Sequence, residues 1–277
     1  MKYLYTYEVS KKKGTELIGT DWSDVEKIIK ENCSQFSWSD PVIWRSTSMP
    51  TNENNYIVDP KGFKRKSRSN KNYYTLLIDS SKQWEKYPKR SSSLICSYIV
   101  PYWKRHLYRV IPFDNSMWGV AEDDDIWTAF QYAKKTYGIG LLDLVRFLDF
   151  LNELIPGEPP IPDNNIQDFK KRMKDIGNKL KDMKYLDLYK VLASWNIKQW
   201  EDVLGVLFSK FIDKGKPFTD FLEDFIDPIK NDIKLLGYNE LNKKEEGYVD
   251  TRKSSEIWTD SKCLLVSKKF LSERGMP

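Results

Sequence analysis

The chain has 277 residues, 40% of them hydrophobic, which suits one large domain or a core domain with an insertion. Its formal net charge is +5, and no run of about 18 apolar residues occurs, which excludes a membrane-spanning helix. Three scattered cysteines and a single histidine exclude a disulfide framework and a zinc site built from several histidines. We therefore expect a cytoplasmic protein without a metal site.

The charge is unevenly distributed along the chain. Residues 1–120 hold 20 Lys and Arg against 12 Asp and Glu, and residues 121–247 hold 19 against 24. Residues 248–277 hold 6 against 4, so both ends are basic and the middle is acidic. A basic region favours a polyanionic partner such as a nucleic acid or a dinucleotide, although a solvated basic face gives the same pattern.

The first part, residues 1–125, is predicted to be rich in strands. Short apolar runs bounded by Pro, Ser, Asn and Asp are the strand candidates: 42–44, 74–78, 94–96 and 108–111. One helix is expected among them, because Ser23 and Glu26 have the spacing of a capping box and Val25 starts an apolar face.

The second part, residues 126–247, is predicted to be helical. Apolar residues recur at helical spacing in four stretches: 141–151, 186–192, 203–211 and 218–236. The Pro-rich stretch 157–162 separates two helices, and Pro228 predicts a kink or a break.

The last part, residues 248–277, returns to a strand pattern. Residues 256–258, a polar turn and residues 263–267 predict a closing β hairpin, which requires the two ends of the chain to meet in space. The expected fold class is therefore α+β, with a mixed or antiparallel β core and a large helical insertion.

Three segments of the predicted core carry residues that suit one chemistry. Arg45 ends an apolar strand, the serine run Ser91–Ser93 leads into the next strand, and Glu256 opens a late strand. Their order and spacing resemble the Arg–Ser–Glu signature of the ADP-ribosyltransferases. The resemblance covers residues 42–125 and 248–267.

The resemblance implies a core of ADP-ribosyltransferase type, NAD as donor, and a catalytic set of Glu256, Arg45, Ser91 and Ser93. A carboxylate beside the sugar stabilises the oxocarbenium-like charge that forms when an N-glycosidic bond breaks, which is the role implied for Glu256. An arginine fork suits a phosphate or ribose, and serine hydroxyls hold the glutamate and sugar in register. A solvent-facing Glu256 and a serine run that only forms a turn are the alternatives.

Two positions depart from the family pattern. Members that modify arginine carry a further glutamate two residues before the catalytic one, where this chain has Ser254. Transfer to protein arginine is therefore not expected. Ser46 follows Arg45, where a smaller residue is usual.

A dense basic segment, residues 61–71, lies between the first two motifs and ends in aromatic residues. Phosphate contacts and a stacking ring there suit nucleic acid, and they suit the pyrophosphate of NAD equally well. The alternative is a solvated basic loop. The expected substrate-binding or nucleic-acid-binding residues are Lys64, Arg65, Lys66, Arg68, Tyr73, Tyr74 and Arg90.

Two other functions remain open from the sequence. A DNA N-glycosylase that excises a modified base would use the same oxocarbenium chemistry without NAD, and a non-catalytic nucleic-acid-binding protein would keep only the scaffold. The segments 84–90 and 108–114 resemble parts of phage-encoded and phage-defence proteins. This resemblance implies a role in phage infection or in anti-phage defence.

Overall fold

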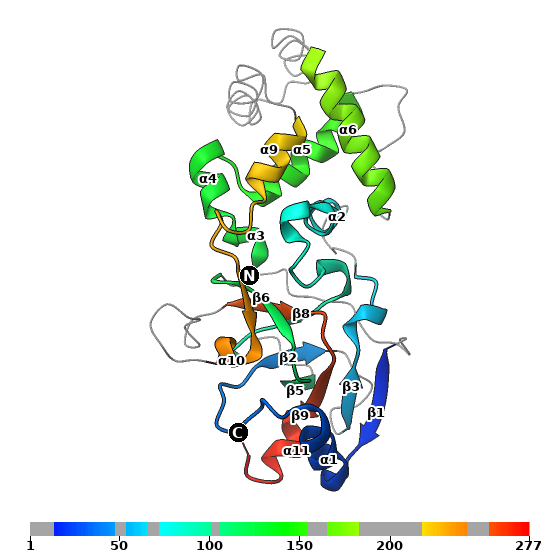
Figure 1. Ribbon diagram of the computed structural model, residues 1–277, viewed down its shortest axis with the longest axis vertical. Helices are drawn as coiled ribbons and strands as arrows, with labels where there is room; N and C mark the ends of the chain where they lie inside the picture. Colours follow the sequence, from blue (N-terminus) through cyan, green and yellow to red (C-terminus); the bar gives the residue numbers. More distant parts are fainter. Residues whose placement is uncertain are drawn as a thin grey trace. The chain divides into compact units, whose positions relative to one another are not determined.

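The computed structural model describes residues 14–47, 54–65, 72–100, 106–123, 125–154, 165–182, 218–242 and 255–276. The chain divides into two compact units. The first unit comprises residues 1–68, 86–126 and 232–277, and the second comprises residues 69–85 and 127–231. The fold is α+β: antiparallel sheets form the first unit, and the described elements of the second unit are helices (Figure 1).

A five-stranded antiparallel sheet joins the two ends of the chain. Its strands, in spatial order, are β1 (Thr15–Gly19), β3 (Asn55–Val58), β9 (Cys263–Ser267), β5 (His106–Pro112) and β2 (Trp44–Thr47). The last strand of the chain, β9, lies between β3 and β5 and pairs antiparallel with both. The expectation that strands from both ends meet is therefore confirmed.

A second, four-stranded sheet is also antiparallel. Its order is β4 (Leu94–Cys96), β8 (Glu256–Thr259), β6 (Met117–Ala121) and β7 (Lys234–Gly237). An isolated bridge, Trp44 to Ser97, connects β2 of the first sheet to the chain just after β4. Alternate residues of both sheets, among them Val110, Trp118 and Ile257, share one buried cluster.

The predicted closing hairpin is not formed. β8 pairs with β4 and β6, whereas β9 pairs with β3 and β5, so the three residues between β8 and β9 carry the chain from one sheet to the other. The segment between β5 and β6 also carries the chain from one sheet to the other. The two connecting segments form hydrogen bonds near each other, at the corner between the sheets. Phe113 N donates to Lys262 O at 3.0 Å, and Thr259 Oγ1 donates to Met117 O at 2.7 Å. Such corners are typical of two sheets that share a core.

Three short α-helices of the first unit accompany the sheets: α1 (Trp22–Asn32), α10 (Tyr238–Leu241) and α11 (Lys268–Ser272). The predicted early helix is present as α1, but its N-cap is Asp21, whose side chain accepts from Ser23 N at 2.9 Å. Val25 on α1 and Phe270 on α11 join Leu264 and Val266 of β9 in a second buried cluster. This packing secures β9 within its sheet.

The second unit contains α2 (Tyr73–Ser80), α4 (Gln131–Tyr137), α5 (Leu141–Leu154), α6 (Ile166–Asp182) and α9 (Phe218–Phe225). The helix predicted over residues 141–151 is α5. α3 (Ile126–Ala129) precedes α4, and η2 (Lys82–Trp84) follows α2. The helices predicted over residues 186–192 and 203–211, and the break at 157–162, lie outside the described residues.

The strand predicted over residues 74–78 is a helix. Every residue of α2 from Tyr73 to Asp79 is buried, and a short, continuously apolar run does not distinguish a buried strand from a buried helix. Tyr73 packs on Phe169 with ring centroids 6.1 Å apart, and Tyr74 packs on Trp127 at 4.5 Å. Aromatic packing within the second unit thus decides the conformation.

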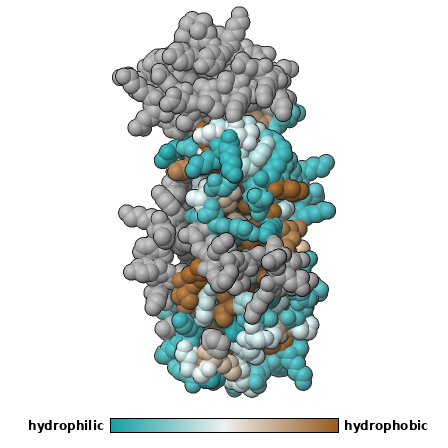
Figure 2. Space-filling view, turned by 90° about the vertical axis from the view of Figure 1, so that its left-hand side faces the viewer, coloured by the Kyte–Doolittle hydropathy of each residue, from teal (hydrophilic) through white to brown (hydrophobic). Residues whose placement is uncertain are grey.

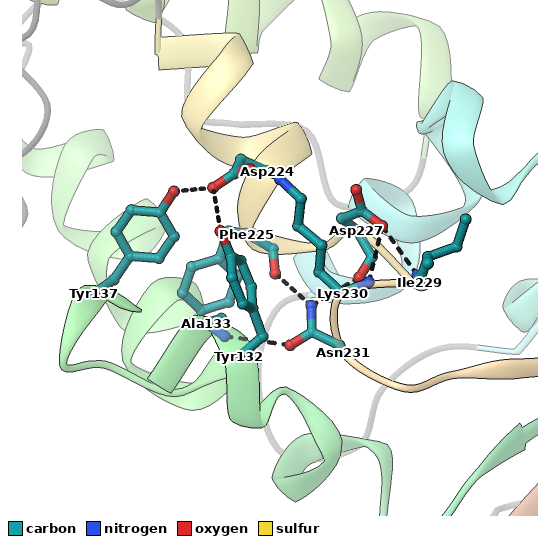
Figure 3. Close-up of polar contacts among 9 residues, drawn as sticks. All are labelled: Tyr132, Ala133, Tyr137, Asp224, Phe225, Asp227, Ile229, Lys230 and Asn231. Carbon is teal, nitrogen blue, oxygen red and sulfur yellow. Dashed lines mark hydrogen bonds and ion pairs between the residues drawn. The ribbon is translucent and has the colours of Figure 1, made fainter. Parts of the chain in front are cut away.

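The helical pattern predicted over residues 218–236 ends early. α9 stops at Phe225, and the Asp227 carboxylate accepts from Ile229 N at 2.9 Å and Lys230 N at 3.2 Å in the turn around Pro228. Asn231 closes this turn by donating to Phe225 O and Asp227 O and accepting from Ala133 N (Figure 3). Residues 232–237, which include β7 (Lys234–Gly237), already belong to the first unit, although the last core segment was predicted to begin only at residue 248.

The described surface is mostly hydrophilic, with small separate apolar patches on the face shown in Figure 2. The large exposed apolar side chains are Leu17, Ile99, Met117, Leu142 and Ile229. Scattered apolar residues of this kind are usual on protein surfaces. Within the described parts of the chain, every helix is too short or too polar to cross a bilayer.

Candidate functional site

Glu256 is the first residue of β8 and is 4% exposed. Its backbone N donates to Asp123 O at 2.8 Å, which fixes the start of the strand. Its carboxylate Oε1 lies 2.6 Å from Arg90 Nη1, in an ion pair whose two side chains are 2% and 4% exposed. Glu256 is thus a buried and paired carboxylate, unlike the solvent-facing strand residue that the sequence left open.

Arg90 is held to β8 by two further contacts. Its guanidinium lies over the Trp258 ring, 4.7 Å from the centroid, and Trp258 Nε1 donates to Pro88 O at 3.0 Å. Glu256 and Trp258 are two residues apart on a strand, so their side chains point to the same face of β8. One face of β8 therefore binds residues 88–90 through an ion pair, a cation–π contact and a hydrogen bond.

Gly119 makes room for the Trp258 ring. It stands opposite Trp258 in the β6–β8 ladder, and a Cβ atom at this position would lie 2.2 Å from Trp258 Cε2 and Cζ2. That distance is far shorter than any van der Waals contact. A side chain at residue 119 would therefore displace the ring on which Arg90 rests.

The serine run begins as a turn and ends at a strand. Arg90–Ser92 form the 3-10 helix η3, in which Ser92 N donates to Lys89 O at 3.1 Å. Ser91 and Ser92 are half-buried, and Ser93 is 1% exposed with its hydroxyl donating to Lys89 O. β4 follows at Leu94, so the run leads into the strand that neighbours β8.

Arg45 lies on β2 and is 5% exposed. Its Nη1 donates to Ile95 O on β4 at 2.5 Å. Burial raises the pKa of the nearby Cys96 thiol to about 12, while the charges of Arg45 and Arg65 act to lower this pKa and that of Glu256 acts to raise it. All three charged groups therefore act on one buried sulfur atom in β4.

The structure thus gathers the three predicted motifs around β4. Arg45 bonds to the middle of the strand, the serine run leads into its start, and Glu256 lies on the neighbouring strand β8. The direct partner of the Glu256 carboxylate is Arg90, which the sequence assigned to ligand binding. No spacing rule connects residues so distant in the chain, and only the pairing of β4 with β8 brings them together.

The predicted binding residues other than Arg90 separate into three groups. Lys64 is exposed and Arg65 is half-buried after η1 (Pro60–Gly62), and Arg65 N donates to Ser91 O at 2.7 Å. Lys66 and Arg68 lie outside the described residues. Tyr73 and Tyr74 belong to the second unit and are 0% and 7% exposed, so their rings pack on the protein's own aromatic side chains and do not present a face for a base.

Two features that the sequence did not indicate complete this region. Trp258 supports Arg90, and Pro88 O anchors the indole of Trp258. Within the described ranges, no group of three or more His, Cys, Asp and Glu side chains is placed to hold a metal ion.

Comparisons of the chain with protein-family models, with curated proteins and with solved structures find no match.

Proposed function

We propose that the chain is an enzyme of ADP-ribosyltransferase type, with a core of that type, that breaks the N-glycosidic bond of NAD and passes ADP-ribose to an acceptor. The observation that carries the proposal is the gathering of Arg45, the serine run and Glu256 around β4. The same three residue types, in the same chain order, make the signature that the sequence resembles.

The proposed chemistry uses the charge of Glu256. As the bond between ribose C1′ and nicotinamide breaks, its electron pair leaves with nicotinamide, and positive charge develops on the sugar. A fixed carboxylate stabilises that charge and accepts a hydrogen bond from the 2′-hydroxyl. The acceptor then bonds to C1′ and loses its proton. Arg45 is the proposed contact for a phosphate or ribose of the donor.

The acceptor is proposed to be nucleic acid, with protein as the alternative. The supporting observation is the bond from Arg65 N to Ser91 O, which ties the basic segment beginning at Lys61 to the serine run. Exposed Lys61 and Lys64 in that segment suit phosphate groups. The same charge distribution supports a DNA N-glycosylase as the second candidate function.

The test is an assay of nicotinamide release by the full-length protein with NAD, alone and with single-stranded or duplex DNA. Abasic sites are measured in the same DNA without NAD. Glu256→Gln removes the charge and keeps the shape, and Glu16→Gln makes the same change at an exposed position of β1.

Nicotinamide release that disappears in Glu256→Gln and persists in Glu16→Gln is the expected result. Abasic sites formed without NAD, and lost in Glu256→Gln, would replace the proposal with the glycosylase. DNA binding with neither product would leave a non-catalytic binding protein.

A further inference from the structure

Arg90 and Glu256 form the most deeply buried ion pair in the described part of the chain. The two side chains are 2% and 4% exposed, and the atoms Nη1 and Oε1 are 2.6 Å apart. Removing one partner of such a pair leaves an uncompensated charge away from water, which is strongly unfavourable. Each residue therefore depends on the other for its place in the fold.

The guanidinium contacts Trp258 as well as Glu256. Trp258 supports its face, and the same indole donates through Nε1 to Pro88 O, two residues before Arg90. Ser93, three residues after Arg90, donates through its hydroxyl to Lys89 O and tightens the turn. Arg90 is consequently anchored both by its side chain and by its backbone, and it has little freedom to follow a ligand.

We infer that Arg90 is the positioning residue of Glu256, and that it sets the orientation of the carboxylate instead of binding a ligand. The contact through Oε1 favours one orientation of the carboxyl group about its last side-chain bond. The catalytic consequence rests on the proposed function: the carboxylate meets the sugar in one fixed orientation. Arg90 therefore acts on the reaction through Glu256.

This role predicts a particular pattern in the kinetics. In Arg90→Met, kcat for nicotinamide release falls about a hundredfold, as expected for a misplaced catalytic group, while KM for NAD stays within about a factor of two. Arg90→Lys retains the charge and recovers part of kcat.

Arg109→Met is the matched control. Arg109 is 1% exposed, lies 4.9 Å from the centroid of Trp38, and donates to Trp38 O and Asp40 O. It stands opposite Trp44, the neighbour of Arg45, in the β2–β5 ladder, so its side chain lies on the face of the sheet away from Arg45. Its loss should lower the melting temperature and leave kcat of the folded enzyme unchanged.

A melting-temperature cycle tests the pairing without any activity. Arg90→Met and Glu256→Gln should each lower the melting temperature, and the double variant should lose less than the sum of the two. Additive losses would overturn the inference. So would a rise in KM at constant kcat, which indicates that Arg90 binds NAD itself. If the wild-type protein releases no nicotinamide, the proposed function fails, and the melting cycle alone then decides whether Arg90 positions Glu256.

Discussion

Gly119 provides the sharpest test of how the fold supports Glu256. In Gly119→Ala, the new methyl group would lie 2.2 Å from two carbons of the Trp258 indole, which is 0% exposed. Overpacking of this kind costs about 1–3 kcal/mol. Displacing the ring also weakens the Trp258–Pro88 hydrogen bond, by about 0.5–1.5 kcal/mol, and the stacking of Arg90, by about 0.5–2 kcal/mol.

Together these effects predict a loss of about 2–6.5 kcal/mol in the free energy of unfolding, a large part of the 5–15 kcal/mol typical of a domain. Guanidinium titration followed by circular dichroism measures it. Gly237→Ala is the control, because its Cβ would meet only Glu240 Oε2 at 3.4 Å, and a change within about 0.5 kcal/mol is expected. The double variant Gly119→Ala, Trp258→Leu should lose less free energy of unfolding than the sum of the losses of the two single variants. A loss below about 0.5 kcal/mol in Gly119→Ala would refute the close contact.

Three further predictions concern other parts of the chain. Asn231→Ala should lower the free energy of unfolding by about 2–4 kcal/mol, because Phe225 O, Asp227 O and Ala133 N lose their partner, whereas exposed Asn178→Ala should change it little in the same titration. Asp21→Ala should cost about 1 kcal/mol through loss of the α1 cap, and Ser23→Ala less, since Ser23 lies inside the helix. Burial raises the pKa of the Cys33 and Cys96 thiols from 9.0 to about 12, so the neutral thiols stabilise the fold fully below pH 9 and this stability is lost as the pH rises from 9 to 12. Denaturant midpoints measured across this pH range should fall less in Cys96→Ala than in the wild type. In the native protein, both thiols should resist a maleimide at pH 8 until the protein unfolds.

The sequence predicted β4, β5, β8 and β9 because their signal is local, whereas the run 42–44 meets β2 only at Trp44 and the strands β1, β3, β6 and β7 were not predicted. The runs at 94–96 and 108–111 fall within β4 and β5, and Glu256 opens β8 as expected. Strand pairing was less accessible, because it depends on contacts between distant segments. The polar turn after β8 looked like a hairpin, yet its bonds to the β5–β6 corner show that it joins two sheets. The sequence of a turn of this length does not indicate which strand the next strand pairs with.

Local patterns were least informative where a segment is wholly buried. Tyr73–Asp79 offers neither the alternation of a strand nor the polar face of a surface helix, and its helical state follows from aromatic partners in α6 and α3. The same limit applies to Arg90. Its place in a basic stretch suggested a ligand contact. The burial that pairs it with Glu256 cannot be read from that stretch, because it exists only after β4 and β8 have paired.

The register of β8 links the stability of the core to the geometry of the candidate site. Ile257 points into the cluster shared by the two sheets, while Glu256 and Trp258 point to the opposite face, toward Arg90. A slip of one residue would exchange these faces and place a carboxylate in an apolar core. The side chain that packs the core therefore also selects the face on which the carboxylate stands. Gly119 and Pro88 then determine where on that face Trp258, and with it Arg90, comes to rest.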